Sequence, residues 1–193
     1  MANGGAAQQA AGADRVWLKQ YASGVPADID ASTYPSLAAV IDRACEQYRE
    51  LAAFENLGAS LSYDDLDRLS QDFASYLQNI AGLHPGDRVA VMMPNLLQYP
   101  IAVFGILRAG LVVVNVNPLY TPRELQHQLK DSGARVIVVV ENCAATLAQV
   151  IADTAIESVI TTQIGDLLPF PKSLLTNFVV KRVKKLVPAF RLS

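Results

Sequence analysis

The stretch Gly86 to Tyr120, GDRVAVMMPNLLQYPIAVFGILRAGLVVVNVNPLY, decides the fold of this chain. It opens with a nearly continuous apolar run over 88–93, which is typical of a strand buried on both faces. A second such run, rich in β-branched residues, covers 111–116. The segment between them is apolar nearly all round and predicts a helix between layers. The stretch therefore indicates two parallel strands joined by a right-handed crossover.

The two ends of this helix are marked unequally by the sequence. Gly110 suits the left-handed conformation just past a helix end, and Arg108 lies near the negative end of the helix dipole. The start stays open between two positions. Asn95 is a good N-cap, whereas Pro100 favours the first helical position and would fall inside a helix capped by Asn95.

Sequence words in and around this stretch resemble a known family. They are PGDRVAVMMPN, GILRAGLVVVNVNPLYT and, most specifically, NPLYTPREL at 117–125. The chain closely resembles the N-terminal part of the adenylate-forming acyl-CoA synthetases, specifically the bacterial long-chain fatty-acid CoA ligases. The resemblance extends from Trp17 to the words LSYDDLDRLSQDFASYLQ and DSGARVIVV, so it covers nearly all of the chain after the first dozen residues.

The resemblance implies a two-step reaction for a full-length parent enzyme. A fatty acid attacks ATP in the presence of Mg²⁺ to give an acyl-adenylate and pyrophosphate, and the thiol of coenzyme A then displaces AMP. The family's phosphate loop, adenylate motif, ribose-binding aspartate and catalytic lysine match nothing between Met1 and Ser193. We therefore assign no catalytic, cofactor-binding or metal-binding residue, and we expect this chain alone to be inactive and to bind none of these cofactors.

Two alternatives to a long-chain ligase stay open. One is the same portion of a medium-chain or aryl acid CoA ligase, because the long-chain assignment depends on NPLYTPREL and the basic tail and not on an acyl pocket. The other is a non-catalytic module that associates with a membrane or assembles with other copies.

Composition excludes several classes of protein. The chain has 193 residues, is 51% hydrophobic and has a net charge of -2, so it can bury a core and gives no reason to expect nucleic-acid binding. Its two cysteines form no pattern, which favours a reducing cytoplasm. Residues 1–13 lack the features of a signal peptide and are expected to be disordered. No apolar run is long enough to span a membrane.

Before the central stretch, the sequence predicts an arm, a helix, a hairpin and a second helix. Residues 14–35 have no clear period and predict an extended arm that Trp17 and Tyr21 could anchor. Apolar residues at helical spacing follow from Leu37, and two short runs flank Gly58 as in a hairpin. Ser62 then marks the start of a helix that Gly82 ends, with Asp65 placed to support the cap.

After the central stretch, strands and helices continue to alternate. Thr121-Pro122-Arg123-Glu124 carries a complete capping-box signature, with proline at the first helical position. A strand over 135–140, a helix over 143–152 and a strand over 158–162 follow. Residues 36–165 are thus predicted to be an α/β unit with a doubly wound, mostly parallel sheet and flanking helices. By resemblance, it is the N-terminal subdomain of an adenylate-forming enzyme.

Several residue groups suggest chemistry but have simpler explanations. No G-x-G-x-x-G, P-loop or G-x-S-x-G motif occurs, which argues against dinucleotide binding, a P-loop and a serine nucleophile. His84 and His127 lack partners at metal-ligand spacing. The aspartates 64, 65 and 67 occupy a first helical turn, where carboxylates favour the dipole.

Four polar residues are predicted near the carboxyl ends of strands, where open α/β sheets bind ligands. They are Asn95, Asn115, Asn117 and Tyr120. Each asparagine also has a structural explanation: Asn95 as a helix cap, Asn115 as a partner of backbone groups, and Asn117-Pro118 as a turn.

The segment 166–193 is basic and amphipathic, with six basic residues against one acid. As a helix over 173–187 it places an apolar arc opposite a basic face, a pattern that can lie on an anionic membrane. Four basic residues at about 1 kcal/mol each give roughly millimolar binding. Alternatively, the arc packs against a part of the protein that lies outside this chain. The residues expected to contact a membrane are Leu174, Leu175, Phe178, Val179, Lys181, Lys184 and Lys185.

We thus expect a cytoplasmic protein with a weak peripheral contact to the inner face of the membrane. Fatty acid and coenzyme A would be met through the remainder of the parent enzyme. Exposed sheet edges also favour a homodimer.

Overall fold

The computed structural model describes residues 15–191 of the chain. The chain divides into two compact units, with the boundary in the sequence after Pro35. Between Arg15 and Pro35 the first unit contains two short 3₁₀ helices, η1 (Val16–Gln20) and η2 (Ala31–Thr33). Arg15 forms an ion pair with Asp28 inside this unit. The disorder predicted for residues 1–13 lies outside the described residues.

The second unit, from Ser36 onward, is built on a four-stranded parallel sheet. The strand order is β4-β3-β5-β6, and every neighbouring pair is parallel. All five residues of β5 and four of the five in β3 are buried, as expected for strands covered on both faces. The strands are β3 (Arg88–Met92), β4 (Val112–Asn115), β5 (Val136–Val140) and β6 (Ser158–Thr162).

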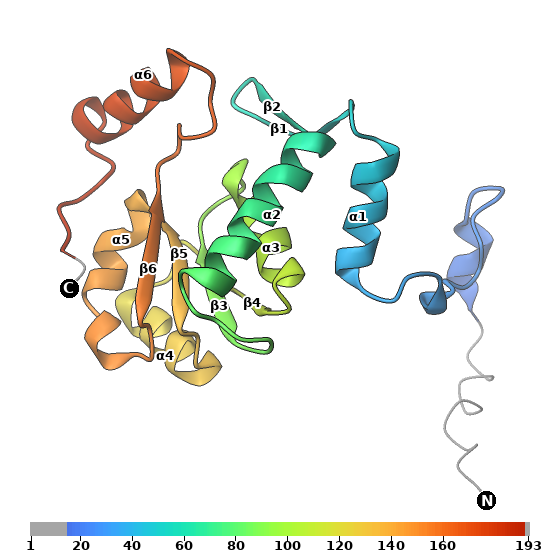
Figure 1. Cartoon of the computed structure of the whole chain (residues 1–193), viewed down its shortest axis with the longest axis horizontal. Coiled ribbons are helices and arrows are strands. Elements are labelled where there is room, and N and C mark those ends of the chain that lie inside the picture. The colour runs from blue at the N-terminus through green and yellow to red at the C-terminus, as the bar shows by residue number, and fades with distance from the viewer. Residues whose placement is uncertain (1–14, 192–193) are drawn as a thin grey trace, which may run out of the picture. The chain divides into compact units, whose positions relative to one another are not determined.

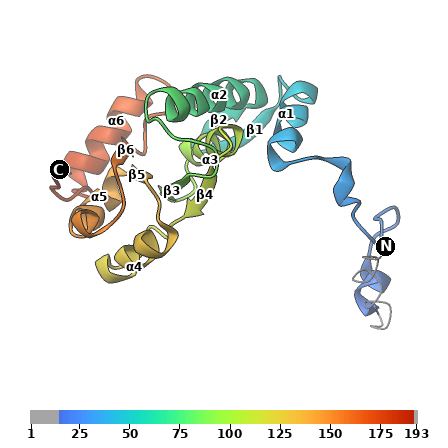
Figure 2. The ribbon, with the colours of Figure 1, turned by 60° about the horizontal axis from the view of Figure 1, so that its bottom comes forward.

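Helices cover both faces of this sheet, so the predicted doubly wound fold is confirmed. In Figures 1 and 2, α2 and α3 lie on one face and α4 and α5 on the other. The chain leaves β3 for β4 through α3 and returns past β3 to β5 through α4. Right-handed crossovers in opposite directions place their helices on opposite faces. These helices are α2 (Tyr63–Asn79), α3 (Gln98–Arg108), α4 (Pro122–Ser132) and α5 (Glu141–Ala148).

A hairpin and a further helix flank this core. The strands β1 (Ala52–Asn56) and β2 (Ala59–Ser62) pair antiparallel, and helix α1 (Leu37–Gln47) precedes them. The turn uses Leu57 and Gly58 at φ of 50° and 68°, so it requires left-handed backbone. A second, smaller apolar cluster joins these elements to α2 and to the start of α3. Its buried members are Cys45, Leu61, Leu66 and Leu97.

Helix starts agree with the sequence where a capping side chain is present. Ser62 caps α2 by accepting from the Asp65 N–H, and Thr121 and Glu124 form the predicted capping box of α4. Gly133 ends α4 at φ 60°, in the left-handed conformation.

Three predicted helices differ from the observed ones. Helix α3 begins at Gln98 with Leu97 as N-cap, so of the two starts left open by the sequence the cap at Asn95 is wrong and the observed start lies two residues before Pro100. Pro100 is tolerated because the N–H groups of the first turn have no helical acceptor. The helix predicted over 143–152 starts directly after β5 at Glu141, whose carboxylate favours the helix dipole, and stops at Ala148 before the 3₁₀ turn η3 (Ile151–Asp153).

The third difference concerns the basic segment. It forms a short α-helix, α6 (Lys172–Phe178), and continues as a π-helical turn, η4 (Val179–Val183). A single regular helix over 173–187 is therefore wrong. We call α6 and η4 together the strap. Figure 1 shows the strap beyond the ends of β5 and β6, away from α2.

Candidate functional site

The site favoured by the topology is the carboxyl edge of the sheet, where Asn115 ends β4 and Asn95, Glu141 and Gln163 follow the other three strands. The crossovers from β3 run in opposite directions, to β4 on one side and to β5 on the other. Open α/β sheets bind ligands in the crevice that forms at such a switch point. The side chains at the carboxyl edge are therefore the first candidates for a functional role.

A continuous chain of polar contacts runs along the carboxyl edge. The amide of Gln98, at the start of α3, donates to Thr162 Oγ1 at 3.2 Å and to the Gln163 carbonyl at 2.8 Å. Gln163 in turn donates to Glu141 Oε1 at 3.0 Å. Lys181 of the strap forms an ion pair with Glu141 Oε2 at 3.1 Å. The Glu141 side chain is only 14% exposed, and its carboxylate binds both Gln163 and Lys181. Such charge-assisted hydrogen bonds are stronger than neutral ones, so Glu141 fixes Lys181 at this edge.

The sequence-based predictions missed this chain of contacts. None of Gln98, Glu141 and Gln163 belongs to a recognised motif. Only their positions in the sequence could have indicated a place at the site, because Glu141 and Gln163 directly follow the ends of β5 and β6. Polar residues immediately after buried parallel strands are the ones that a sheet brings together at its carboxyl edge.

The strap is held against the body by its polar face. The Asn177 side chain accepts from the Gly165 N–H at 2.7 Å and donates to Asp166 Oδ1 at 3.1 Å. A Cβ at Gly165 would lie 2.6 Å from Asn177 Oδ1, so glycine is required for this approach. Lys181, in the π-helical turn η4, adds the ion pair to Glu141.

Backbone atoms fix the strap at its two ends. Lys172 donates through Nζ to the carbonyl of Leu57 in the hairpin turn. Beyond the strap, the Leu186 carbonyl accepts from Asn142 Nδ2 at 3.0 Å. The strap is therefore tied to the hairpin, to the loop after β6 and to the first turn of α5.

The apolar side chains of the strap are exposed as a consequence. Leu174, Leu175 and Phe178 are 59–64% exposed, and Val179 is half-buried. Lys184 and Lys185 are exposed beyond η4, whereas Lys181 is committed to Glu141. The predicted separation of apolar and basic residues is present, but part of the polar face contacts the protein.

The four polar residues predicted near the carboxyl edge have internal partners or packing roles. The Asn95 carbonyl accepts from Asn56 Nδ2 at 2.9 Å, and the Asn115 side chain accepts from Tyr99 Oη at 2.9 Å. The Asn117 side chain accepts from the Leu119 N–H, forming the expected turn. Tyr120 packs against the main core.

A cleft of about 360 Å³ opens beside the carboxyl end of β3. One wall comes from the hairpin and the other from the loop and first turn leading into α3. Its lining combines apolar side chains with a few polar ones, the usual make-up of a small-molecule site. Its lining includes Phe54, Asn56, Asn95, Leu96, Tyr99 and Pro100.

Three charged groups with shifted pKa values lie together at the opposite, amino-terminal edge of the sheet. A hydrogen bond from the His84 backbone N–H, with Arg135 nearby, lowers the pKa of Asp87. Arg135 also lowers the pKa of Glu157 and has its own pKa raised. Since Arg135 bridges Asp87 and Glu157 at 2.7 Å each, this trio joins the starts of β3, β5 and β6 and serves the fold.

Other groups considered from the sequence form no site. His84 and His127 are exposed. Asp64 pairs with Arg49, Asp65 with Arg68 and Asp67 with Arg108. Between Arg15 and Arg191 no three histidine, cysteine or acidic side chains are grouped as a metal would require. In the same range no helix is both long and apolar enough to cross a membrane.

Comparison with known proteins supports one family. The family model described as AMP-binding enzyme matches residues 41–189. Long-chain-fatty-acid–CoA ligases of Yersinia pestis and Haemophilus influenzae are 54% and 53% identical to the chain over 179 residues, 93% of its length. The chain spans about a third, 32%, of the length of these relatives.

Solved structures give the same result. A long-chain-fatty-acid-CoA ligase from Archaeoglobus fulgidus is 28% identical, with a TM-score of 0.63 over 74% of this chain and 30% of that one. A benzoate CoA ligase from Burkholderia xenovorans is also 28% identical, with a TM-score of 0.61 over 65% of this chain and 25% of that one. The resemblance inferred from NPLYTPREL and its neighbouring words is thus confirmed. The chain belongs to the family of AMP-binding enzymes.

Proposed function

We propose that the chain is the N-terminal part of an ATP-dependent long-chain fatty-acid CoA ligase. The observation that carries this proposal is the similarity to curated ligases of that name over almost the whole chain. The proposal favours long-chain substrates over medium-chain or aryl acids, because these relatives share more sequence with the chain than the benzoate ligase does.

The proposed reaction activates a free carboxylate, which is a poor electrophile. A carboxylate oxygen attacks the α-phosphorus of ATP and the bond to pyrophosphate breaks. The coenzyme A sulfur then attacks the acyl carbon of the adenylate, and AMP leaves with the bonding electrons. Catalysis needs positioning and charge stabilisation, for which Mg²⁺ and a phosphate loop are suited. We propose that residues outside this chain supply both, and that the 193-residue chain alone is inactive.

The test begins with the source DNA beyond the codon of Ser193. We expect the frame to continue into a Gly/Ser/Thr-rich loop with a lysine, and the complete product to exchange pyrophosphate with ATP when palmitate is added. Octanoate and benzoate should support exchange more weakly. A frame that stops at Ser193, or a complete product inactive with every acid, would overturn the ligase proposal. Exchange by the 193-residue chain alone would overturn the second part.

A second candidate function is attachment to an anionic membrane surface. The outward-facing Leu174, Leu175 and Phe178, with Lys184 and Lys185 beyond them, support it. We propose a cytoplasmic protein that touches the inner face of the membrane through these residues. Attraction of about 1 kcal/mol per basic residue makes such attachment weak and salt-dependent.

Co-sedimentation with phosphatidylglycerol vesicles tests this attachment. Binding should fade as salt is added and should be lost in Lys184→Gln/Lys185→Gln, whereas Lys130→Gln, an exposed lysine on α4, should bind normally. Equal binding by both variants, or none at low salt, would contradict a membrane role for the strap.

We further propose that copies of the chain self-associate. In the described part of the chain, β4 and β6 each pair with one neighbour only, so both outer strands offer unpaired backbone groups.

A further inference from the structure

The two walls of the cleft beside β3 belong to different pieces of the fold. One wall is the β1–β2 hairpin, which among the described strands forms a separate two-stranded sheet. The other wall is the loop and first turn of α3, which follow directly from β3 of the parallel sheet. The width of the cleft therefore depends on the contacts that fix the hairpin.

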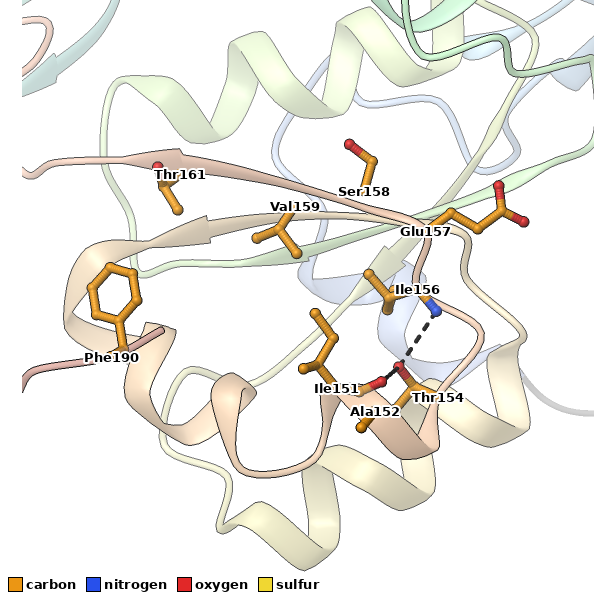
Figure 3. A pocket seen from close by; sticks show the side chains of 9 residues that line it. All are labelled: Ile151, Ala152, Thr154, Ile156, Glu157, Ser158, Val159, Thr161 and Phe190. Atoms are coloured by element: carbon orange, nitrogen blue, oxygen red, sulfur yellow. Dashed lines mark hydrogen bonds between the residues drawn. The ribbon is translucent and has the colours of Figure 1, made fainter. Parts of the chain in front are cut away.

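The larger groove of about 650 Å³, beside β6, is built differently. Figure 3 shows Val159 of β6 directed toward this groove, with Ile151 of η3 opposite. The hydrogen bonds drawn there stay within one loop, since Thr154 Oγ1 donates to the Ile151 carbonyl at 2.8 Å and accepts from the Ile156 N–H at 3.4 Å. Most of the lining is one continuous segment that ends in the parallel sheet, so this groove lacks a separate wall.

Two contacts fix the tip of the hairpin, and they come from different parts of the chain. Asn56 donates through Nδ2 to the Asn95 carbonyl at 2.9 Å, which joins the two walls of the cleft. The Leu57 carbonyl accepts from Nζ of Lys172, the first residue of α6. A hydrogen bond from an ammonium group is stronger than a neutral one. The strap thus holds the hairpin as firmly as the α3 wall does.

The turn geometry explains why the tip takes a partner from outside the hairpin. Leu57 and Gly58 both have positive φ and lie between the paired residues Asn56 and Ala59. In such a two-residue turn the carbonyl of the first turn residue points away from the ladder and needs another donor. Lys172 Nζ supplies it and approaches so closely that a Cβ at Gly58 would lie 3.2 Å away.

Apolar packing joins the same regions. The loop between β6 and α6 places Leu167 against the second apolar cluster, whose buried members include Leu61 of β2 and Leu97. Leu97 also lines the cleft. The hairpin, the cleft and the segment that leads into the strap therefore share one cluster.

We propose that the strap is a brace that sets the position of the hairpin wall of the cleft, with Lys172 as the positioning residue. Asn177 and Lys181 fix the strap to the body, and α6 carries Lys172 from these anchors to the hairpin turn. A change in the docking of the strap would reach the cleft through this one ammonium group. The inference depends on contacts within the chain and does not require ligase activity.

Hydrogen exchange followed by mass spectrometry tests the brace in the 193-residue chain. In Lys172→Met the peptide 52–62 should exchange about fivefold faster, because the Leu57 carbonyl loses its charged donor. Lys172→Arg keeps a charged donor at this place and should restore most of the protection. Lys184→Met, at an exposed lysine just beyond η4, is the matched control and should leave the exchange of peptide 52–62 unchanged.

A double-mutant cycle tests the route through the strap. Asn177→Ala removes the tie to Gly165 and should speed the exchange of peptide 52–62 when residue 172 is lysine. The same change should add little when residue 172 is methionine, because the hairpin is then already released from the strap. Circular dichroism melts establish that all the variants are folded.

The outcomes separate this proposal from the others. Unchanged exchange of peptide 52–62 in Lys172→Met, or equal acceleration in Lys184→Met, overturns the positioning role of Lys172. Equal acceleration by Asn177→Ala with lysine and with methionine at position 172 overturns the brace, because the hairpin then responds by another route. None of these results bears on pyrophosphate exchange by the complete product, so failure here and failure of the ligase proposal are distinguishable.

Discussion

Arg108 shows at the scale of one residue how burial decides the value of an ion pair. Its guanidinium, 9% exposed, contacts Asp42 at 2.7 Å and Asp67 at 2.6 Å. It also donates to Ser70 Oγ and to the Asp67 carbonyl, each at 2.8 Å. These bonds join the end of α3 to α1 and α2. Removing Arg108 leaves Asp67 and the buried Ser70 without this partner, which costs more than the pair itself contributes.

We predict that Arg108→Met lowers the free energy of unfolding by about 3 kcal/mol or more. Arg49→Met is the matched control, since Arg49 pairs with Asp64 at the same 2.6 Å but both side chains are more than half exposed. That change should cost less than about 1 kcal/mol. Urea unfolding measures both values, and equal losses would show that burial is not the deciding factor.

At the scale of one element, α4 depends on its capping box. Thr121 Oγ1 accepts from the Glu124 N–H, and the Glu124 carboxylate accepts from the hydroxyl and the backbone N–H of Thr121 at 2.7 and 2.8 Å. We predict that Thr121→Ala destabilises the unit by about 1 kcal/mol, measured by urea unfolding. The contribution of Pro122, the first residue of α4, should not change in this variant, because proline has no N–H group that needs an acceptor.

The same box makes a specific prediction about pH. The hydrogen bonds from the Thr121 hydroxyl and backbone lower the pKa of Glu124. Its contribution to stability is thus fully present above the ordinary glutamate pKa and is lost as the pH falls through the lowered folded value. Glu124→Gln can still accept both bonds but does not titrate. The stability difference between this variant and the unmodified chain should therefore change with pH only in that acidic range, and a constant difference would refute the assignment.

At the scale of the whole molecule, the core belongs to one unit. Every buried side chain of the described residues lies between Cys45 and Leu168. We predict that a chain of residues 36–193 folds cooperatively, with a melting temperature within about 4 °C of the full chain, since the deletion removes no buried side chain of the described residues. A matched deletion that also removes α1 takes Cys45 from the second apolar cluster and should melt far lower. Loss of cooperative melting in the first deletion would contradict the prediction.

The sequence predicted those elements whose boundaries are set by neighbouring residues. The capping box at Thr121, the cap at Ser62 and strand 158–162 all agree with the structure, because each signal acts within a few residues. The start of α3 did not, because Asn95 and Pro100 gave conflicting local signals and packing placed the helix between them.

Contacts between distant residues account for what could not be predicted at the candidate site. Lys181 pairs with Glu141, 40 residues earlier, and Gln98 reaches Gln163, 65 residues later. An amphipathic pattern shows which residues share a face but not which face meets the protein. The sequence therefore indicated the apolar residues of the strap, whereas its docking through Asn177 and Lys181 could not be predicted.

The attachment of the strap has a consequence for how its surface can change over evolutionary time. Two of its ties end on main-chain atoms of the body, the Leu57 carbonyl and the Gly165 N–H, and just beyond the strap the Leu186 carbonyl accepts from Asn142. Main-chain atoms persist through side-chain replacement. Residues 174, 175 and 178 can therefore drift or be redesigned without moving the segment that carries them, so one scaffold could be retargeted to another surface by exchanging three side chains.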